Sequence, residues 1–409
     1  MDFYAFYTGQ CFDAYTWLGA HLEGERAVFR TFAPAAAGVV LLHGGRELPM
    51  ERVHDGNFFE VWAEGVRPGD CYQYRIYRPD GGYTDHCNPY GYGMELRPGR
   101  CSVVRDLGEH TFEDGAWMAS RTDRRQEPLH IYELHLGSWR RKPDGGWYRY
   151  DELAWPLIEY VKECGYNYVE FLPLSEHPCD ESWGYQITGF YAPTSRYGTA
   201  KELMLLIDRL HQAGIGVILD FVPAHFAVDD YGLARYDGQA LYEYPHRDVE
   251  VSEWGSHNFI HSRGEVRSFL QSCARYWLDV FHFDGLRMDA ICAGCCYGVE
   301  AAEPWGIPFT HAIAAPNGVP LLPVQLYECA AELMIFLFLL WYAPRAASKG
   351  GILRAYMLAY APVRFVLEFF RGDVVRGIYG PLSTSQWISL AVMAAAVVWL
   401  VRERRENRS

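Results

Sequence analysis

Residues 281–306 read FHFDGLRMDAICAGCCYGVEAAEPWG and change character part-way along. The first half is an apolar run that delivers Arg287 and Asp289, as a buried parallel strand delivers charged side chains at its carboxyl end. The second half is rich in cysteine and leads into sequence that is almost free of charge. The chain is therefore expected to consist of two unlike parts that meet near residue 291.

Charge and cysteine content narrow the class of protein. The 409 residues carry a formal net charge of -14, and of the charged residues only 8 acidic and 10 basic ones lie beyond residue 290. A nucleic-acid partner is not expected, because binding to phosphates requires a clustered basic surface. The eleven cysteines are an odd number, scattered through a chain too large to need disulfides, which indicates reduced thiols of a cytoplasmic type. The first ten residues lack the pattern of a signal peptide.

Residues up to about 106 have an all-β pattern. In CYQYRIY (71–77), large apolar side chains alternate with polar ones, and the following RPDGGY contains the Asp-Gly pair of a hairpin turn. AVFRTFAP (27–34) and NFFEVWAEG (57–65) are similar short runs. Together they predict a β-sandwich.

From residue 128 the pattern becomes an alternation of strand and helix. Four runs have the continuous hydrophobicity of parallel strands buried on both faces: they are IYELHLGSW (131–139), YNYVEFLPL (166–174), IGVILDFVPAHF (215–226) and FHFDGLRMDAI (281–291). Thr199 and Glu202 have capping-box spacing at the start of an amphipathic helix that Gly214 can end. The pattern fits four β/α units of a (β/α)8 barrel or part of a doubly wound sheet.

Beyond Pro323 three apolar runs follow one another, each about twenty residues long, the length that crosses about 30 Å of hydrocarbon. They end in the basic tail RERRENRS (402–409), which favours about three transmembrane helices over the alternative of core helices in a large domain. This predicts a multi-pass membrane location for the C-terminal third.

Two charged pairs stand at the expected strand ends. Asp220 closes the third run, with His225 five residues on, and Asp289 closes the fourth, two residues after Arg287. Residues two apart on a strand point to the same face, so Arg287 can keep Asp289 ionised, as a nucleophile requires. The pattern is typical of an active site at the carboxyl ends of barrel strands.

Residues 1–291 resemble the glycogen branching enzymes of the α-amylase superfamily. The resemblance rests on TWLGAH, FRTFAPAA, NPYG, IYELHLGSWRR, EHPCDESWGYQITGFYAPTSRYGT, GVILDFVPAHF and DGLRMDA. It implies transfer of an α-1,4-glucan chain to a 6-hydroxyl, with Asp289 as nucleophile held ionised by Arg287. Asp220 and His225 would line the sugar subsite and Tyr185 would stack under the same ring. No metal or cofactor is implied.

Part of that family's machinery is missing from the sequence. A retaining enzyme needs a second carboxylic acid about 5 Å from its nucleophile, and the superfamily takes it from a Glu after the fifth strand. It takes a further Asp from after the seventh strand. No acid beyond Asp289 has a comparable context. The truncated barrel is therefore expected to be inactive in branching.

The cysteine cluster CAGCC (292–296) has the C-x-x-C spacing of a zinc half-site or a redox pair. A second cysteine pair is lacking downstream, and no thioredoxin-like context surrounds the cluster. We therefore expect neither a metal site nor a redox centre here.

The sequence from residue 291 onward resembles instead the C-terminal half of prolipoprotein diacylglyceryl transferase. AGCCYGVEAAEPWGIPF, PVQLYE, YAPVRFVLEFFRGD and GPLSTSQWISL carry the resemblance. Arg364 and Glu368 lie four apart on one helix face, where they can pair. The resemblance implies a membrane and phosphatidylglycerol as partners, with these lipid-site candidates: Arg364, Glu368, Tyr360, Gln325, Tyr327 and Gly298.

The resulting division is a β-sandwich of immunoglobulin-like, carbohydrate-binding type (1–106), a linker (107–127), half of an amylase-type barrel (128–291), a junction (292–322) and membrane helices (323–409). Three functions stay open. They are a truncated branching enzyme fused to a transferase fragment, an incomplete membrane lipid transferase, and a non-catalytic glucan-binding protein tethered to a membrane.

Overall fold

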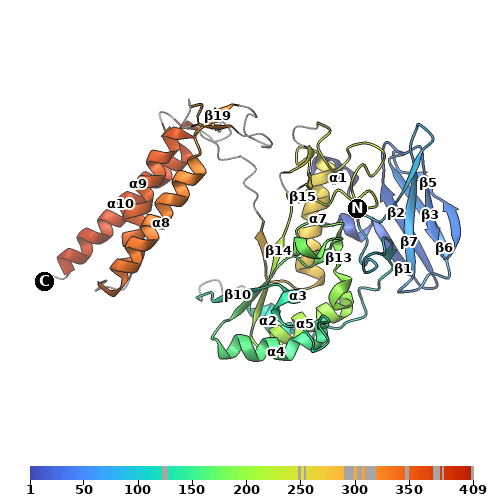
Figure 1. Ribbon diagram of the computed structural model, residues 1–409, viewed down its shortest axis with the longest axis horizontal. Coiled ribbons are helices and arrows are strands. Elements are labelled where there is room, and N and C mark those ends of the chain that lie inside the picture. The colour runs from blue at the N-terminus through green and yellow to red at the C-terminus, as the bar shows by residue number, and fades with distance from the viewer. Residues whose placement is uncertain are drawn as a thin grey trace. The chain divides into compact units, whose positions relative to one another are not determined.

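A computed structural model of the chain describes residues 1–121, 128–246, 250–252, 255–289, 299–301, 306–308, 319–345, 350–371, 378–379 and 382–406. It divides into two compact units, Met1–Ala290 and Ile291–Ser409 (Figure 1). The boundary between them falls at the change in sequence character around residue 291.

The N-terminal part of the first unit is a sandwich of two antiparallel sheets, as predicted. One sheet has the order β1-β2-β6-β5 and the other the order β4-β3-β7-β8, with β9 paired to β7. The strands are β1 Gly19–Glu23, β2 Arg26–Phe32, β3 Gly38–His43, β4 Arg46–Pro49, β5 Glu51–Val53, β6 Phe58–Glu64, β7 Cys71–Tyr77, β8 Tyr83–His86 and β9 Ser102–Val103. Tyr72, Tyr74 and Ile76 of β7 are buried, so its alternating pattern is confirmed.

The chain before the sandwich packs against a helix of the second part of this unit. Helix α1 (Phe3–Thr8) and the 3-10 turn η1 (Ala14–Thr16) lie against α7 (Gly264–Val280). The Ser268 hydroxyl donates to the Phe6 carbonyl at 2.8 Å, and the Ser272 hydroxyl accepts from the Tyr15 N–H at 3.1 Å. One hydrophobic core runs through the sandwich and the helices.

The second part of the unit is built on a parallel sheet. Its order is β10-β11-β14-β17, from Ile131–Leu134, Tyr168–Phe171, Gly216–Phe221 and Gly285–Met288. The spatial order follows the chain order without the reversal that marks a doubly wound sheet, so the barrel-type arrangement is the correct one of the two predicted.

Helices alternate with the parallel strands (Figure 1). They are α2 Gly115–Ser120, α3 Leu136–Trp139, α4 Tyr150–Glu163, α5 Ala200–Gln212 and α7, with the small strands β12 Ser175–Glu176, β13 Gly189–Pro193, β15 His225–Phe226 and β16 His257–Asn258 between them. The 3-10 turns η3 (Asp180–Ser182) and η4 (Ser195–Tyr197) lie in the same region. The predicted capping box is present, because Thr199 and Glu202 exchange hydrogen bonds at the start of α5.

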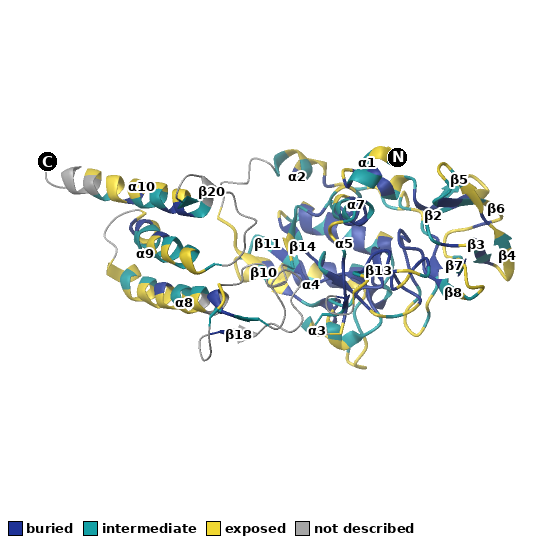
Figure 2. Ribbon diagram, turned by 90° about the horizontal axis from the view of Figure 1, so that it is seen from above, coloured by how far each residue is buried: buried dark blue, intermediate teal, exposed yellow. Residues whose placement is uncertain are grey.

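The two faces of the parallel sheet differ in burial. Glu133, Glu170, Ile218 and Gly285 are register partners across the four strands and therefore share one face. These four residues are exposed or half-buried, whereas Val169, Val217 and Leu219 on the opposite face are buried. Figure 2 shows strands β10, β11 and β14 coloured by burial. The exposed face is the one that would line the interior of a closed barrel.

A buried polar cluster fixes the segment that connects the two parts of the first unit. The two ring nitrogens of His211 lie 2.8 Å from Asp114 and 3.1 Å from Asp284. Trp117 stacks on the imidazole at 5.1 Å and donates from its indole N–H to Asp284 at 2.8 Å. His282 also contacts Asp114, at 2.9 Å. These contacts attach residues 114–117 to the amino-terminal edge of the parallel sheet.

The second unit consists, in its described residues, mainly of helices. They are α8 Val324–Tyr342, α9 Gly351–Leu367 and α10 Thr384–Glu406, and α9 packs against both of the others (Figure 1). The 3-10 turns η5 (Ala343–Arg345) and η6 (Glu368–Phe370) follow α8 and α9, and the short strands are β18 Ile307–Pro308, β19 Pro320–Leu321, β20 Ile378–Tyr379 and β21 Leu382–Ser383.

The prediction of three transmembrane helices is not supported by these elements. Among the residues with described structure, no helix combines the length and apolarity needed to cross a membrane. Helix α9 has 17 residues, about 26 Å at 1.5 Å per residue, and contains Arg354 and Arg364, while α8 contains Glu328 and Glu332. The multi-pass membrane location expected from the apolar runs is therefore wrong.

Candidate functional site

Two neighbouring strands bring the predicted charged residues together. Asp220 and Arg287 are register partners on β14 and β17. The Arg287 guanidinium donates to both carboxylate oxygens of Asp220, at 3.0 and 2.9 Å, and to Asp289 at 3.0 Å. The arginine thus lies between the two carboxylates at the carboxyl end of the sheet, where barrel enzymes hold their catalytic groups.

Tyr185 approaches the same cluster from the loop between β11 and β13. Its hydroxyl donates to Asp220 at 2.6 Å. The loop turns sharply just before it, because Trp183 has a φ of 53° and Gly184 a φ of 93°. A Cβ at position 184 would lie 2.5 Å from the Pro173 carbonyl oxygen, so only glycine fits there.

The environment of Asp220 pulls its pKa in two directions. Burial raises the pKa, while the hydrogen bonds from Tyr185 and Arg287 lower it, and the net direction is upward. The contact with Asp220 raises the pKa of Arg287, which stays charged. His225 is buried beside this cluster; burial lowers its pKa and the nearby Asp289 raises it in part.

An ion-pair network holds the loop that carries Tyr185. Glu176 and Arg196 form a buried pair at 2.7 Å, and Arg196 also reaches Asp180 at 2.7 Å. Arg97, from the end of the sandwich, donates to Asp180 from Nε at 2.8 Å. Hydrogen bonds from Arg97 and Arg196 lower the pKa of Asp180 to about 2. The loop is thereby tied to both parts of the first unit.

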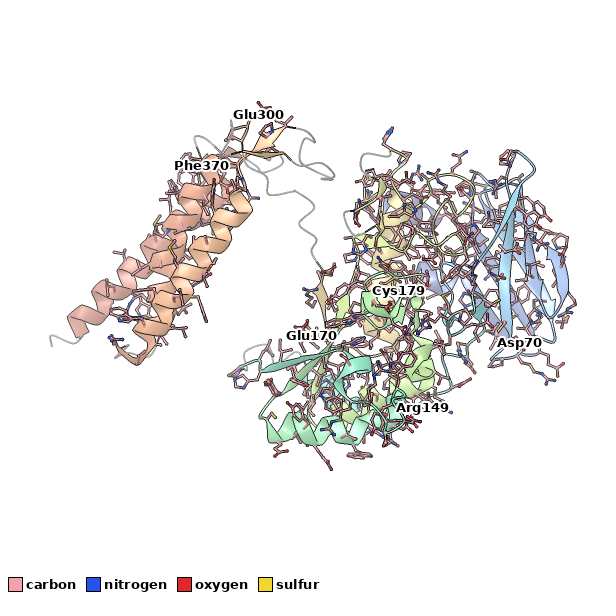
Figure 3. All side chains as sticks on the ribbon, in the orientation of Figure 1. Asp70, Arg149, Glu170, Cys179, Glu300 and Phe370 are labelled. Carbon is pink, nitrogen blue, oxygen red and sulfur yellow. The ribbon has the colours of Figure 1, made fainter. Side chains whose placement is uncertain are left out.

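Glu170 is a member of this electrostatic environment that sequence reasoning did not select. It lies on β11 (Figure 3), and burial raises its pKa, with further upward contributions from Glu133 and Asp220. The signal in the sequence was a glutamate inside an apolar strand run. The structure adds the register, which places Glu133 and Glu170 on the face that carries Asp220 and Arg287.

In the second unit, the predicted lipid-site residues of α9 meet one another. Arg364 pairs with Glu368 at 3.1 Å and lies 3.9 Å from Glu328 of α8. Ser383 donates to Glu368 at 2.8 Å. Burial and the nearby carboxylate of Glu328 raise the pKa of Tyr360. Glu328 was not among the predicted site residues, and its distance along the chain from Arg364 gave no signal.

The remaining predicted lipid-site residues of this unit lie on α8 or outside the described residues. Tyr327 is exposed on α8, where Gln325 also lies. Gly298 and the cluster 292–296 lie outside the described residues. Over the part of the chain with described structure, no group of three or more His, Cys, Asp and Glu side chains is arranged to hold a metal ion.

Comparison with known families assigns different segments to different proteins. The N-terminal domain of alpha-1,4-glucan branching enzyme matches residues 1–90, and the catalytic domain of alpha amylase matches residues 156–240. Prolipoprotein diacylglyceryl transferase matches residues 285–402. A branching-enzyme-like segment is thus followed by a transferase-like segment. The last match begins within β17, so Arg287 lies inside it.

Curated relatives agree with the first assignment. The 1,4-alpha-glucan branching enzyme of Dechloromonas aromatica is 45% identical over 70% of this chain and 48% of its own length. That of Desulfitobacterium hafniense is 44% identical over 71% of this chain and 47% of its own length. The chain therefore spans about half the length of the curated relatives it matches.

Solved structures show the same fold. A crystal structure described as an alpha amylase from Salmonella typhimurium has a TM-score of 0.57 and 26% identity, over 73% of this chain and 46% of that one. A pullulanase from Paenibacillus barengoltzii, 23% identical, has a TM-score of 0.54 over 69% of this chain and 52% of its own. The sandwich and the parallel sheet are thus of the amylase type.

Proposed function

We propose that residues 1–290 recognise an α-1,4-glucan through the cluster of Asp220, Arg287, Asp289 and Tyr185. The observation that carries this proposal is the pairing of Arg287 with both carboxylates at the carboxyl end of the parallel sheet. Supporting it, the relatives at about 45% identity are branching enzymes of α-1,4-glucan.

Each residue of the cluster has a role that its contacts suit. Arg287 donates a hydrogen bond to Asp289, whose carboxylate is the group that would attack an anomeric carbon. Asp220 and His225 line the sugar subsite. Tyr185, whose hydroxyl bonds to Asp220, forms the wall of the subsite on the side of the loop. In the complete reaction, the glucan chain held on Asp289 would pass to a 6-hydroxyl of another chain.

We further propose that this chain binds glucan without branching it efficiently. The four parallel strands supply Asp220 and Asp289, but a retaining mechanism also needs a proton donor about 5 Å from the nucleophile. General acid catalysis contributes about 10²- to 10⁴-fold to the rate. A chain that has lost turnover can therefore still bind glucan. A glucan-binding protein is the preferred hypothesis, without the membrane tether that the sequence predicted.

Binding and turnover are tested separately on the full chain. Isothermal titration with maltoheptaose is expected to show binding that Asp220→Asn weakens and the exposed control Asp144→Asn leaves unchanged. An iodine-stain assay with amylose is expected to show no branching. The proposal fails if Asp220→Asn binds maltoheptaose as well as the unaltered chain does.

A second candidate function concerns residues 291–409. We propose that Arg364, whose side chain is positioned by ion pairs with Glu368 and Glu328, binds the anionic headgroup of a phospholipid such as phosphatidylglycerol. The match to prolipoprotein diacylglyceryl transferase supports this ligand class. Detergent micelles doped with phosphatidylglycerol should bind the chain more tightly than micelles doped with phosphatidylcholine. Arg364→Gln should remove that preference, while Arg345→Gln, at an exposed position in η5, should retain it.

The division of the chain follows from these two proposals. We propose a carbohydrate-binding sandwich over residues 1–106, a linker over 107–127, half of a barrel over 128–291, a junction over 292–322 and a transferase-like helical segment over 323–409. Truncation of the barrel within a fused gene accounts for a chain that spans about half of its relatives' length.

A further inference from the structure

A cavity lies near the carboxyl end of the parallel sheet, beside the cluster of Asp220 and Asp289. It has a volume of ≈ 190 Å³, and its lining includes Trp147, Trp183 and Tyr197. The walls come from separate segments, because Trp147 precedes α4, Trp183 lies in the loop after β11 and Tyr197 belongs to η4. His135, which follows β10 directly, also contributes to the lining.

Trp183 is held in an unusual position. Its side chain is 52% exposed although it is large and apolar, and its backbone has the left-handed φ of 53° that bulky residues rarely adopt. The indole stacks on the His135 imidazole, with ring centroids 5.4 Å apart and planes 10° from parallel. The fold therefore maintains a flat aromatic surface that faces solvent at the cavity, which is the arrangement of a binding platform.

The polar groups of the cavity are balanced in charge. The lining contains two guanidinium groups and two carboxylates, those of Arg141, Arg196, Asp180 and Glu181, so their formal charges cancel. His177 is neutral, because burial lowers its pKa to about 4, and its Nδ1 lies 2.9 Å from the Ser175 carbonyl, which leaves Nε2 as an acceptor. Polar groups of balanced formal charge beside aromatic rings fit a neutral, polyhydroxylated ligand better than an anion or a cation.

We propose that this cavity binds a glucose ring of an α-glucan chain, as a second subsite beside the cluster of Asp220 and Asp289. One loop serves both places, since Trp183 stands two residues before Tyr185, whose hydroxyl contacts Asp220. Strand β10, which His135 follows, and strand β14, which carries Asp220, are separated only by β11. The inference rests on the proposed function, because the ligand is the same glucan.

The test uses isothermal titration of the full chain with maltoheptaose. Trp183→Ala and Trp147→Ala remove two walls of the cavity that belong to different segments, and each is expected to lower the affinity about five- to tenfold. Trp155→Ala is the matched control, because Trp155 is a similarly exposed tryptophan on α4, 59% exposed, that does not line the cavity. Circular dichroism of each variant checks that its fold is retained.

The outcomes separate this subsite from the proposed function. A loss of affinity in both cavity variants but not in Trp155→Ala supports the subsite. Unchanged affinity in folded Trp183→Ala and Trp147→Ala overturns the subsite, even where Asp220→Asn weakens binding and the proposed function stands. Weakened cavity variants beside an unaffected Asp220→Asn would leave the subsite standing and refute the role given to Asp220. A wild-type chain that does not bind maltoheptaose refutes both.

Discussion

Replacing His211 with alanine should destabilise the first unit strongly. The imidazole is fully buried between Asp114 and Asp284, whose side chains are 2% and 6% exposed. Each ring nitrogen lies within hydrogen-bonding distance of a carboxylate oxygen, which accepts such a bond. The substitution removes these two bonds together with the stacking surface of Trp117.

The magnitude follows from what remains after the change. A hydrogen bond to a charged group contributes about 1.5–3 kcal/mol, and two are lost. His282 still contacts Asp114, while Trp117 and the Val217 N–H still donate to Asp284, so neither carboxylate is left without a donor. We therefore expect a loss of about 3–6 kcal/mol with no added penalty for an unpaired carboxylate, a large share of the 5–15 kcal/mol that stabilises a typical domain.

The assay is urea unfolding of the full chain, followed by circular dichroism and tryptophan fluorescence. The two compact units can unfold in two separate transitions. The urea midpoint is therefore taken from the transition that differs between the wild type and His211→Ala. His130→Ala is the control, because that side chain is exposed, and it should stay within about 0.5 kcal/mol of the wild type. A loss below about 1 kcal/mol for His211→Ala would refute the reasoning that the cluster anchors the connecting segment.

Three further predictions concern single contacts. Tyr185→Phe removes the hydrogen bond to Asp220, which should cost about 1–2 kcal/mol in urea unfolding and raise the pKa of Asp220, measurable by carboxyl NMR. The hydrogen bond from Arg97 lowers the pKa of Asp180, so the ionised Asp180 stabilises the fold above about pH 4, and this stabilisation is lost as the pH falls toward 2. The difference in Tm between the wild type and Asp180→Asn should therefore narrow between about pH 4 and pH 2. Thr199→Ala removes the cap of α5 and should cost about 1 kcal/mol, whereas Thr199→Ser should cost little, as thermal unfolding can check.

The regular elements of the first unit could be predicted from local pattern. The alternation in 71–77 and the capping box at Thr199 depend only on near neighbours in the chain, and both appear in the structure. The choice between a barrel and a doubly wound sheet could not be made from pattern alone, because it depends on the order of strands in space.

The candidate site could be predicted only in part, for the same reason. Strand ends identified Asp220 and Asp289, but the register that places Arg287 between them is a long-range property. The attachment of Asp180 to Arg97 joins residues 83 apart in the chain, and no periodicity encodes such a contact. Glu170 was visible as a charged residue inside the apolar run 166–174 but was not selected.

The error over the membrane has a different cause. A run of about twenty apolar residues specifies hydrophobicity, but not where the helix begins and ends. The predicted run around Arg354 and Arg364 forms a helix of 17 residues, with both arginines inside it. Run length alone therefore overstated the apolar span.

The contact between α1 and α7 bears on how such proteins can be recombined. Family matches end at residue 90 and resume at residue 156, which suggests that the two parts are separable pieces. The hydroxyls of Ser268 and Ser272, however, are bonded to the backbone of the first fifteen residues. Joining the sandwich to the barrel of another protein would remove the hydrogen-bond partners of these hydroxyls and expose part of the shared hydrophobic core to water. A working hybrid would therefore have to exchange the leading segment and α7 as a matched pair.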